Sequence, residues 1–318
     1  MTDPLPAEFS LIARHFRPLA GAGSLDLRDD AAELVPPEGR VLVLTADAMV
    51  AGVHFLPDDP PDLVGQKLLR VNLSDLAAKG AVPLGYLMTV SCPRGTPDAW
   101  YAGFAAGLAR DQATYGITLL GGDTTSTPGP ISLSLTAIGH IAPNQGVHRF
   151  GARAGDGIWV TGTIGDGALG LRVALGEIAD PTGFLLDRYR LPRPRIGLAI
   201  GGIATAGMDV SDGLVQDLSH ICRASGLMAD VRVDWVPLSD QARAAGPAWL
   251  ETCLTGGDDY EVLLAVPDAH EAALRQAADR AGIPVTRIGT FHSGEPRVML
   301  RDGAGTVLPI QKGGWSHF

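Results

Sequence analysis

Hydrophobic and polar positions in the first part of the chain follow helical and strand spacing in turn. Apolar residues at i, i+3, i+4 and i+7 predict an amphipathic helix over Glu8–Phe16. Further helices are predicted over Leu63–Lys79, which Gly80 ends, and over Pro97–Tyr115, which starts with proline. Short apolar runs predict strands over Val41–Thr45 (ending just before Asp47), Leu84–Ser91, Ile117–Leu120 and Ile131–Ile141.

A polar, glycine-rich stretch, Pro143–Gly155, separates this region from a second region of mixed character. Strands are predicted in that region over Ile158–Thr161, Tyr260–Val266 and Val285–Phe291. Helices are predicted over Gly165–Leu175, Arg195–Ala206, Asp212–Ala224 and Asp268–Ala281. We therefore expect an α/β (α+β) protein of two domains, residues 1–142 and 143–318.

Composition and charge narrow the class of protein. The 318 residues include 35 Asp and Glu against 25 Lys and Arg, for a net charge of −10, which disfavours a nucleic-acid-binding protein. A hydrophobic content of 46% excludes a disordered chain. The sequence has no long apolar run and no visible secretion signal, so we expect no membrane partner and a cytoplasmic location. Three scattered cysteines, Cys92, Cys222 and Cys253, are expected to be buried free thiols.

Aspartate supplies 27 of the 35 acidic residues, whereas lysine supplies only 3 of the 25 basic ones. The aspartates gather in six short clusters, which we expect at strand ends and in turns: Asp29-Asp30, Thr45-Ala46-Asp47, Asn72-Leu73-Ser74-Asp75, Gly121-Gly122-Asp123-Thr124, Asp209-Val210-Ser211-Asp212-Gly213 and Gly256-Gly257-Asp258-Asp259. One such cluster is typical of an ordinary turn or helix start. Several carboxylates around one site repel each other unless cations hold them, and a donor set of oxygens favours Mg²⁺ that bridges substrate phosphates.

Other nucleotide-binding and catalytic motifs are missing from the sequence. No G-x-x-x-x-G-K-[ST] phosphate loop occurs. The segment 162–167 lies between a predicted strand and a predicted helix, but its glycines do not have the G-x-G-x-x-G spacing of a dinucleotide site. Neither H-E-x-x-H nor G-x-S-x-G is present. Metal ions would therefore supply the positive charge that lysine supplies at other phosphate sites.

In this order the motifs resemble the thiamine-monophosphate kinase family. That family belongs to an ATP-binding superfamily that also includes aminoimidazole ribonucleotide synthetase and selenophosphate synthetase. The resemblance spans nearly the whole chain. Besides the aspartate clusters, it rests on Glu8–Ile12, Val50–Phe55, Val71–Ala78, Arg149 before Gly151, Val160–Gly162, Gly257–Glu261 and Gly314–Phe318.

The resemblance implies a fold, a reaction and partners. The fold is two-domain and aminoimidazole ribonucleotide synthetase-like. Its N-terminal domain has a mixed sheet with helices, binds ATP and Mg²⁺, and pairs in a homodimer, while its C-terminal α/β domain completes the site. The implied reaction is direct, in-line, Mg²⁺-assisted transfer of the γ-phosphoryl group of ATP to thiamine monophosphate, which gives thiamine diphosphate.

Roles carry over from the family position by position. The residues that resemble its Mg²⁺ ligands are Asp30, Thr45, Asp47, Asp75, Asp123, Asp209 and Asp212. The residues that resemble its ATP-phosphate contacts are Gly122, Asp123, Arg149 and Ser211. His54, Asp258 and Trp315 resemble its substrate contacts. Among all of these, Asp47, Asp75, Asp123 and Asp212 are the expected catalytic group.

The sequence departs from the family pattern at three places. Asp26-Leu27-Arg28 replaces Gly-Ile-Gly, Ala46 replaces a threonine, and Asp258 replaces a glutamate. Two alternatives therefore stay open: another enzyme of the superfamily, such as aminoimidazole ribonucleotide synthetase, and a non-catalytic nucleotide-binding homologue. Selenophosphate synthetase would carry a reactive cysteine in an N-terminal loop, and the hydrogenase-maturation carbamoyl dehydratase would end in one; neither is present.

Overall fold

The computed structural model describes residues 7–309 and 314. The chain divides into two compact units. The first comprises Met1–Leu76 and Ala81–Pro143, and the second comprises Ala77–Gly80 and Asn144–Phe318. Within the described ranges, no helix has the length and apolar character needed to cross a membrane.

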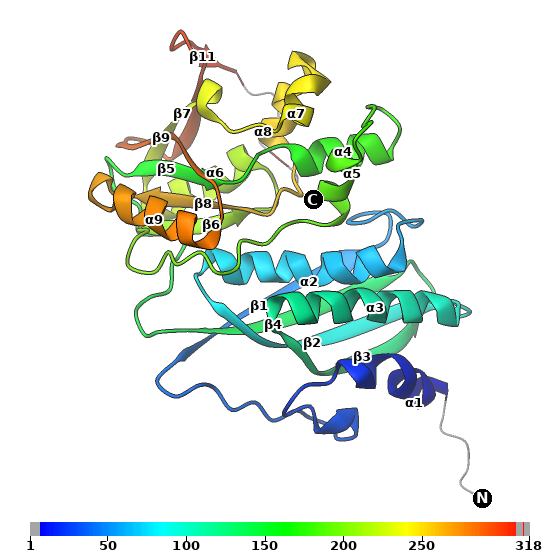
Figure 1. The fold of residues 1–318 in the computed structure, drawn as a ribbon. Helices are drawn as coiled ribbons and strands as arrows, with labels where there is room; N and C mark the ends of the chain where they lie inside the picture. The colour runs from blue at the N-terminus through cyan, green and yellow to red at the C-terminus, as the bar shows by residue number, and fades with distance from the viewer. Residues whose placement is uncertain (1–6, 310–313, 315–318) are drawn as a thin grey trace, which may run out of the picture. The chain divides into compact units, whose positions relative to one another are not determined.

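The first unit is built on a mixed four-stranded sheet with the strand order β1-β4-β2-β3. Its strands are β1 (Val41–Val50), β2 (Val82–Pro93), β3 (Thr118–Thr127) and β4 (Ser132–Ile141). Strand β4 is antiparallel to β1 and β2, whereas β3 runs parallel to β2. Helices α2 (Pro61–Ala78) and α3 (Asp98–Tyr115) lie along this sheet in Figure 1.

Glycines let α2 and α3 pack closely. A Cβ atom on Gly107 would lie 2.0 Å from the carbonyl oxygen of Asp62, and one on Gly65 would lie 2.4 Å from that of Phe104. Short helical pieces precede the sheet: α1 (Ala7–Leu11), a π-helical turn (Ile12–Phe16) and two 3-10 turns (Arg17–Leu19 and Leu25–Leu27). The core between helices and sheet contains fully buried side chains, among them Leu69, Leu73, Tyr86, Phe104 and Leu135.

The second unit contains a seven-stranded sheet with the order β11-β10-β7-β9-β5-β8-β6. Its strands are β5 (Gly157–Thr161), β6 (Ala206–Val210), β7 (Leu227–Arg232), β8 (Glu261–Val266), β9 (Val285–Ser293), β10 (Arg297–Arg301) and β11 (Val307–Leu308). Its helices are α4 (Asp166–Ala174), α5 (Phe184–Arg190), α6 (Leu214–Ser225), α7 (Asp240–Ala245), α8 (Leu250–Thr255) and α9 (Glu271–Ala281). Short 3-10 turns cover Val233–Trp235, Pro247–Trp249 and Asp268–His270.

Both faces of this second sheet carry a hydrophobic core. In β5, Ile158 and Val160 belong to the cluster that includes residues of α6, whereas Trp159 belongs to the cluster that includes residues of α9. Neighbouring residues of a strand point to opposite faces, so α6 and α9 cover opposite sides of the sheet. A strand buried on both faces reads as a continuous apolar run, as β5 and β8 do.

The structure confirms the α/β class and most predicted elements, with one clear error. The predicted helix over Arg195–Ala206 is wrong: residues 195–205 are irregular and Ala206 begins β6. Gly197 and Gly202 have φ values of +93° and +72°, which a helix does not tolerate. The apolar spacing there comes from loop residues such as Leu198 and Ile200 that are buried in the second core.

Candidate functional site

The first unit brings three predicted metal ligands together, on β1 and α2. The hydroxyl of Thr45 donates a hydrogen bond of 2.5 Å to Oδ2 of Asp75. Asn72, one turn before Asp75 on α2 and fully buried, accepts the backbone N–H of Asp47 through Oδ1 at 3.1 Å. Asn72 was missed as a site residue, although its position at i−3 from Asp75 places both on one face of a helix. The amide of Asn72 thus fixes the place of Asp47 relative to Asp75.

Asp47 and Asp123 occupy regular strands, which corrects the expectation of strand ends and turns. Strand β1 continues through Val50, and β3 includes Gly122 and Asp123. Asp75 also lies within a regular element, helix α2, and not in a turn. Side chains within a ladder or helix have directions that the repeating backbone dictates.

The register also separates two of these ligands. Asp47 pairs with Leu135, Leu135 with Met88, and Met88 with Gly122, so one row crosses the whole sheet from β1 to β3. Three interstrand spacings amount to about 14 Å. Two aspartates on one ion, with metal–oxygen bonds of about 2.1 Å, span a shorter distance than that. Asp123 directly follows Gly122 in β3. Asp47 and Asp123 of the same chain therefore do not bind one ion together.

Two further predicted residues of the first unit, Asp30 and His54, lie in loops. Asp30 is exposed, and its N–H donates to Oδ1 of Asp29 at 2.8 Å. Nδ1 of His54 accepts the N–H of Val50 at 3.0 Å, so a neutral ring carries its hydrogen on Nε2. His54 is thus oriented as a hydrogen-bond donor through Nε2.

The departure Asp26-Leu27-Arg28 has a visible backbone consequence. Asp26 and Leu27 have φ values of +59° and +53°, in the left-handed region that glycine adopts most readily. The carbonyl of Asp26 accepts Nε of Arg17 at 3.1 Å. Of the two positions where the family has glycine, Asp26 therefore has a left-handed backbone, whereas Arg28 has an ordinary φ of −115°.

In the second unit, the predicted residues Asp209, Ser211 and Asp212 surround the end of β6 and the start of α6. Asp209 lies within β6 and is 4% exposed. Asp212 lies just before the N-cap residue, Gly213, and its Oδ2 accepts Nε2 of Gln216 at 3.2 Å. The start of a helix of this length carries unpaired N–H groups and the positive end of the helix dipole, which favour a phosphate.

Asp258 sits directly beside this turn. Its N–H donates to the carbonyl of Ser211 at 2.9 Å, and the N–H of Tyr260 donates to that of Val210 at 2.8 Å. Both Asp258 and Tyr260 have positive φ, +73° and +53°. Gly257 allows the close approach, because a Cβ there would lie 2.3 Å from the carbonyl oxygen of Ser211. A predicted ATP-phosphate contact and a predicted substrate contact are thereby joined backbone to backbone.

A buried charge network that the sequence reasoning missed supports the Asp258 loop. Glu261, fully buried, accepts hydrogen bonds from Arg188 at 3.0 Å and from Nε of Arg195 at 2.6 Å. Arg188 also donates to the carbonyl of Asp259 at 3.1 Å. The Asp259 carboxylate accepts the N–H groups of Gly165 and Gly167 at 2.7 and 3.0 Å, and burial raises its pKa well above the ordinary value.

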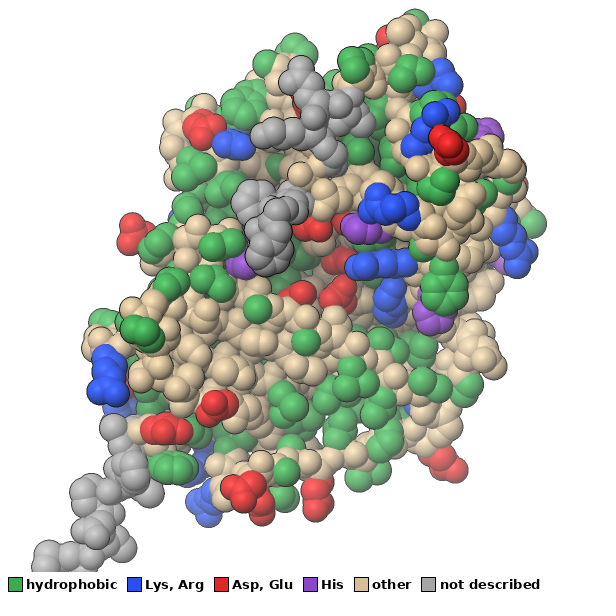
Figure 2. Space-filling view, turned by 180° about the vertical axis from the view of Figure 1, so that it is seen from behind, with side chains coloured by type: hydrophobic (Ala, Val, Ile, Leu, Met, Phe, Trp, Pro, Cys, Tyr) green, Lys and Arg blue, Asp and Glu red, His purple; other side chains and the backbone are tan. Residues whose placement is uncertain are grey.

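Arg149 and the chain end complete the predicted set. Arg149 is exposed, and the rings of its two sequence neighbours, His148 and Phe150, stack on each other. The pKa of His220 is lowered, first by burial, then by the charge of Arg223 and then by the charge of Arg149. Trp315 lies outside the described residues, but Gly314 approaches α6: a Cβ there would lie 2.4 Å from Cβ of Gln216. Figure 2 shows basic side chains and histidine beside acidic ones on one face of the molecule.

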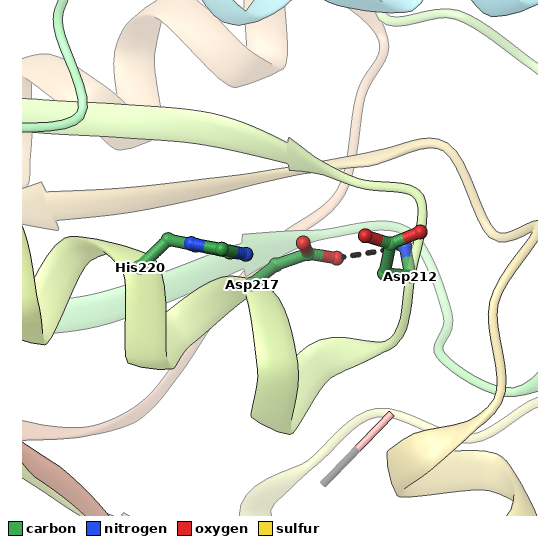
Figure 3. Close-up of side chains that lie close together, drawn as sticks. All are labelled: Asp212, Asp217 and His220. Atoms are coloured by element: carbon green, nitrogen blue, oxygen red, sulfur yellow. Dashed lines mark hydrogen bonds between the residues drawn. The ribbon is translucent and has the colours of Figure 1, made fainter. Parts of the chain in front are cut away.

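Among the described residues, one group of three possible metal ligands lies within 4.8 Å of one another: Asp212, Asp217 and His220 (Figure 3). Burial, followed by the nearby Asp212 carboxylate, raises the pKa of Asp217 to about 7. The hydroxyl and carboxylate oxygens of Thr45, Asp75 and Asp212 match the donors that Mg²⁺ prefers. Mg²⁺ in phosphate-transfer sites takes only one or two carboxylates besides water and substrate oxygens, so the small donor set of each unit, taken by itself, is compatible with it.

Comparisons with known proteins identify the family of this chain. Residues 28–141 match the family model for the AIR synthase related protein, N-terminal domain, and residues 153–300 match that for its C-terminal domain. The thiamine-monophosphate kinase of Caulobacter vibrioides is 47% identical over 98% of this chain and 91% of its own length.

Solved structures agree as well. Thiamine-monophosphate kinase from Stenotrophomonas maltophilia matches with a TM-score of 0.80 and 36% identity, over 88% of this chain and 90% of that one. The structure of AaThiL complexed with AMPPCP and TMP matches with a TM-score of 0.78 and 31% identity, over 91% of each chain. The predicted resemblance is confirmed, and this chain belongs to the thiamine-monophosphate kinase family.

Proposed function

We propose that this chain transfers the γ-phosphoryl group of ATP directly to the phosphate of thiamine monophosphate, giving thiamine diphosphate and ADP. The family supports this activity, and so does the neighbouring structure that holds AMPPCP and TMP. The observation that carries it is the junction of Ser211 and Asp258, with their 2.9 Å backbone hydrogen bond. That junction supports the proposal, because the turn we assign to phosphate and the carboxylate we assign to the cationic thiamine are neighbours.

The acidic residues of both units would hold Mg²⁺. We assign Asp30, Thr45, Asp47, Asp75, Asp123, Asp209 and Asp212 to this role. When bound, Mg²⁺ neutralises charge on the phosphates and on the in-line transition state.

The chain's own groups position the two substrates. Arg149 presents a planar guanidinium to phosphate oxygens, and Gly122 and Ser211 offer close backbone approach. The nucleophile is a phosphate oxygen of thiamine monophosphate. Since the second pKa of a phosphate monoester is about 6, this oxygen is already ionised at pH 7, and no side chain has to remove a proton.

We assign three contacts to thiamine monophosphate, with Asp258 and Trp315 at its thiamine end. The Asp258 carboxylate would face the cationic thiamine, and His54 would donate from Nε2, because its Nδ1 already accepts the N–H of Val50. Trp315 would stack on a ring of the substrate, as an aromatic face attracts a cation. Asp258 is one methylene shorter than the family's glutamate, so the substrate would have to lie closer to the backbone here.

The direct test is an assay of the purified protein. With Mg²⁺, ATP and thiamine monophosphate, it should form thiamine diphosphate and ADP in equal amounts, and EDTA should abolish the reaction. ATP binding without thiamine diphosphate formation would refute the kinase activity and favour a non-catalytic nucleotide-binding protein.

We also propose a homodimer that forms through the β1–β4 sheet of the first unit. Leu44 on β1 and Leu87 on β2 are 62% and 39% exposed, while Met49 of β1 and Tyr86 and Met88 of β2 are buried in the core. Ala46 pairs with Thr136, which in turn pairs with Leu87, so this exposed row continues across three strands. An exposed apolar surface on a sheet is typical of an interface.

The separation of Asp47 and Asp123 within one sheet supports a catalytic role for the dimer. Because these residues lie on opposite edges of one sheet, a site that needs both is completed when a second copy supplies one of them. We therefore propose that Asp47 of one protomer and the β3 segment of its partner serve the same site.

Mixed dimers test this sharing. Asp47→Asn and Asp123→Asn variants, each inactive alone, should regain about a quarter of the wild-type activity when refolded together, because random pairing gives half mixed dimers with one intact site each. No recovery, with dimers present by light scattering, would show that each protomer carries its own complete site. A Leu44→Glu variant should weaken the dimer.

We place the enzyme in the cytoplasm. Cys92, Cys222 and Cys253 are all buried free thiols, as a reducing compartment favours.

A further inference from the structure

The turn before α6 lacks a cap of its own. Its N-cap residue, Gly213, has no side chain to accept the unpaired N–H groups at the helix start. Gly213 has a φ of +118°, and a Cβ there would lie 2.5 Å from the carbonyl oxygen of Thr255, so no serine or aspartate fits this position. The turn needs an acceptor from elsewhere.

Asp217 supplies that acceptor from the first turn of α6. Its Oδ2 accepts the N–H of Asp212 at 3.0 Å (Figure 3) and the N–H of Gly213 at 3.2 Å. The N–H of Asp217 donates in return to the carbonyl of Gly213 at 3.0 Å. Asp217 is only 1% exposed, so these bonds are shielded from water. One buried carboxylate thus fixes two successive residues of the turn.

The hydrogen-bond pattern distinguishes Asp217 and His220 from metal ligands. Arg223 can only donate, so its 3.0 Å contact makes Nδ1 of His220 the acceptor. A neutral ring then carries its hydrogen on Nε2. Figure 3 shows the ring directed toward the Asp217 carboxylate, so a hydrogen and not a lone pair faces Asp212 and Asp217. His220 is therefore unsuited to bind a cation, and Oδ2 of Asp217 is occupied by two N–H groups, so we take Asp212 as the cation ligand of the three.

We propose that Asp217 is a positioning residue for the phosphoryl transfer: it holds the Ser211–Gly213 turn in the conformation in which Asp212 binds Mg²⁺. This inference rests on the proposed function, because it takes Asp212 as a metal ligand. Residues that orient metal ligands typically change metal affinity by about 10- to 100-fold when they are removed.

Metal titration of four variants tests the proposal. Mn²⁺ binding to the ATP-loaded protein is followed by the EPR signal of free Mn²⁺, for Asp212→Asn, Asp217→Ala, Asp217→Asn and Asp156→Ala. Asp156 is a matched control: it is 4% exposed and accepts the N–H of Arg153 at 2.9 Å and the hydroxyl of Thr205 at 2.5 Å, away from this turn. Thermal unfolding is recorded for each variant.

Asp217→Ala should weaken Mn²⁺ binding by about 10- to 100-fold, in the same direction as Asp212→Asn. Asp217→Asn should restore most of the affinity, since the amide oxygen still accepts both N–H groups. Asp156→Ala should lower thermal stability without changing Mn²⁺ affinity. Unchanged affinity in a folded Asp217→Ala, or equal losses in Asp217→Asn and Asp212→Asn, would overturn the positioning role.

Two features keep the test decisive. Mn²⁺ binding needs no turnover, so it is read even if the wild-type protein forms no thiamine diphosphate, an outcome that would contradict the proposed function alone. If Asp217→Ala does not fold, the rates of amide hydrogen exchange in the wild-type protein test the proposal instead. The Asp212 and Gly213 amides should exchange far more slowly than in a free peptide of that sequence, and equally fast exchange would overturn the proposal.

Discussion

The tripeptide Gly-Gly-Asp occurs twice in this chain, and the two copies have different structures. Residues 121–123 lie inside β3, where Gly122 and Asp123 pair regularly with Met88 and Thr89 of β2. Residues 256–258 lie in a loop, where Asp258 takes a left-handed backbone and its N–H donates to Ser211. The same three residues thus present an aspartate from a ladder in one unit and from a strained loop in the other.

The difference lies in what fixes each aspartate. Strand register alone sets the place of Asp123. Asp258 depends on contacts between segments distant in sequence, namely the Ser211 turn and the buried network around Glu261. We therefore expect mutations in the first copy to change activity, and mutations in the second copy to change both stability and substrate binding.

The largest expected effect is on the buried network beneath the second copy. Glu261→Gln removes the carboxylate that pairs with Arg188 at 3.0 Å and leaves this 2% exposed guanidinium only the more distant Asp166 carboxylate, at 4.0 Å. Removing one partner of a buried pair typically lowers the free energy of unfolding by about 3–5 kcal/mol. Chemical denaturation measures this, with Arg172→Ala as control. Arg172 forms an exposed pair with Glu177, and its loss should cost less than about 1 kcal/mol. Equal effects would show that the network does not support the loop.

Substitutions of Asp123 and Asp258 should change different kinetic constants. Asp123→Asn should lower kcat by about 10²- to 10³-fold, because it removes the negative charge that would hold a transition-state-stabilising Mg²⁺ ion. Asp258→Asn should mainly raise the KM for thiamine monophosphate, by about 10-fold, the size of one lost charged hydrogen bond. Steady-state kinetics with Asp234→Asn, an exposed aspartate paired with Arg232, provides the control. A fall in kcat alone for Asp258→Asn would contradict its place at the thiamine end.

The two glycines of the first Gly-Gly-Asp copy, Gly121 and Gly122, should differ in how much stability is lost when each is replaced by alanine. Gly122→Ala places a Cβ 1.8 Å from the carbonyl oxygen of Met88, whereas Gly121→Ala places one 3.5 Å from a Leu87 methyl group, an ordinary contact. Overlap with rigid backbone costs about 1–3 kcal/mol, so Gly122→Ala and Gly257→Ala should lower thermal stability and Gly121→Ala should not. Thermal unfolding of the three variants measures this, and a loss in Gly121→Ala equal to the others would refute the distinction.

The smallest expected effect concerns another left-handed aspartate. Asp26 stands where the family has glycine and has a φ of +59°. Asp26→Gly relieves that conformation but adds freedom to the unfolded chain, so we expect a net gain of about 0.5 kcal/mol. Asp234→Gly, where no such strain exists, should lose stability. A loss in both would mean that the Asp26 loop is not strained.

The sequence was informative where one element decides the structure. The apolar spacing over Pro97–Tyr115 predicted α3 almost to the residue, because that helix ends at Gly116 with a left-handed φ of +66°. It failed over 195–205, where apolar residues serve a core distant in sequence while glycines interrupt the helix. Short strands such as β10 and β11 depend on partners distant in sequence and were not predicted.

The same limit applies to the site. Residue types and order led to the aspartates that we assign to the site, but they predicted neither the row that separates Asp47 from Asp123 nor the burial of Asp217 and Glu261. Those properties follow from sheet register and packing, which no local pattern carries.

The transfer of a labelled phosphoryl group tests the central claim most directly. With [γ-³²P]ATP, thiamine monophosphate and Mg²⁺, the label should appear in the terminal phosphate of thiamine diphosphate, with one ADP formed for each. Label that appears only in inorganic phosphate, or no label released from ATP, would contradict the assignment of this chain as a thiamine-monophosphate kinase.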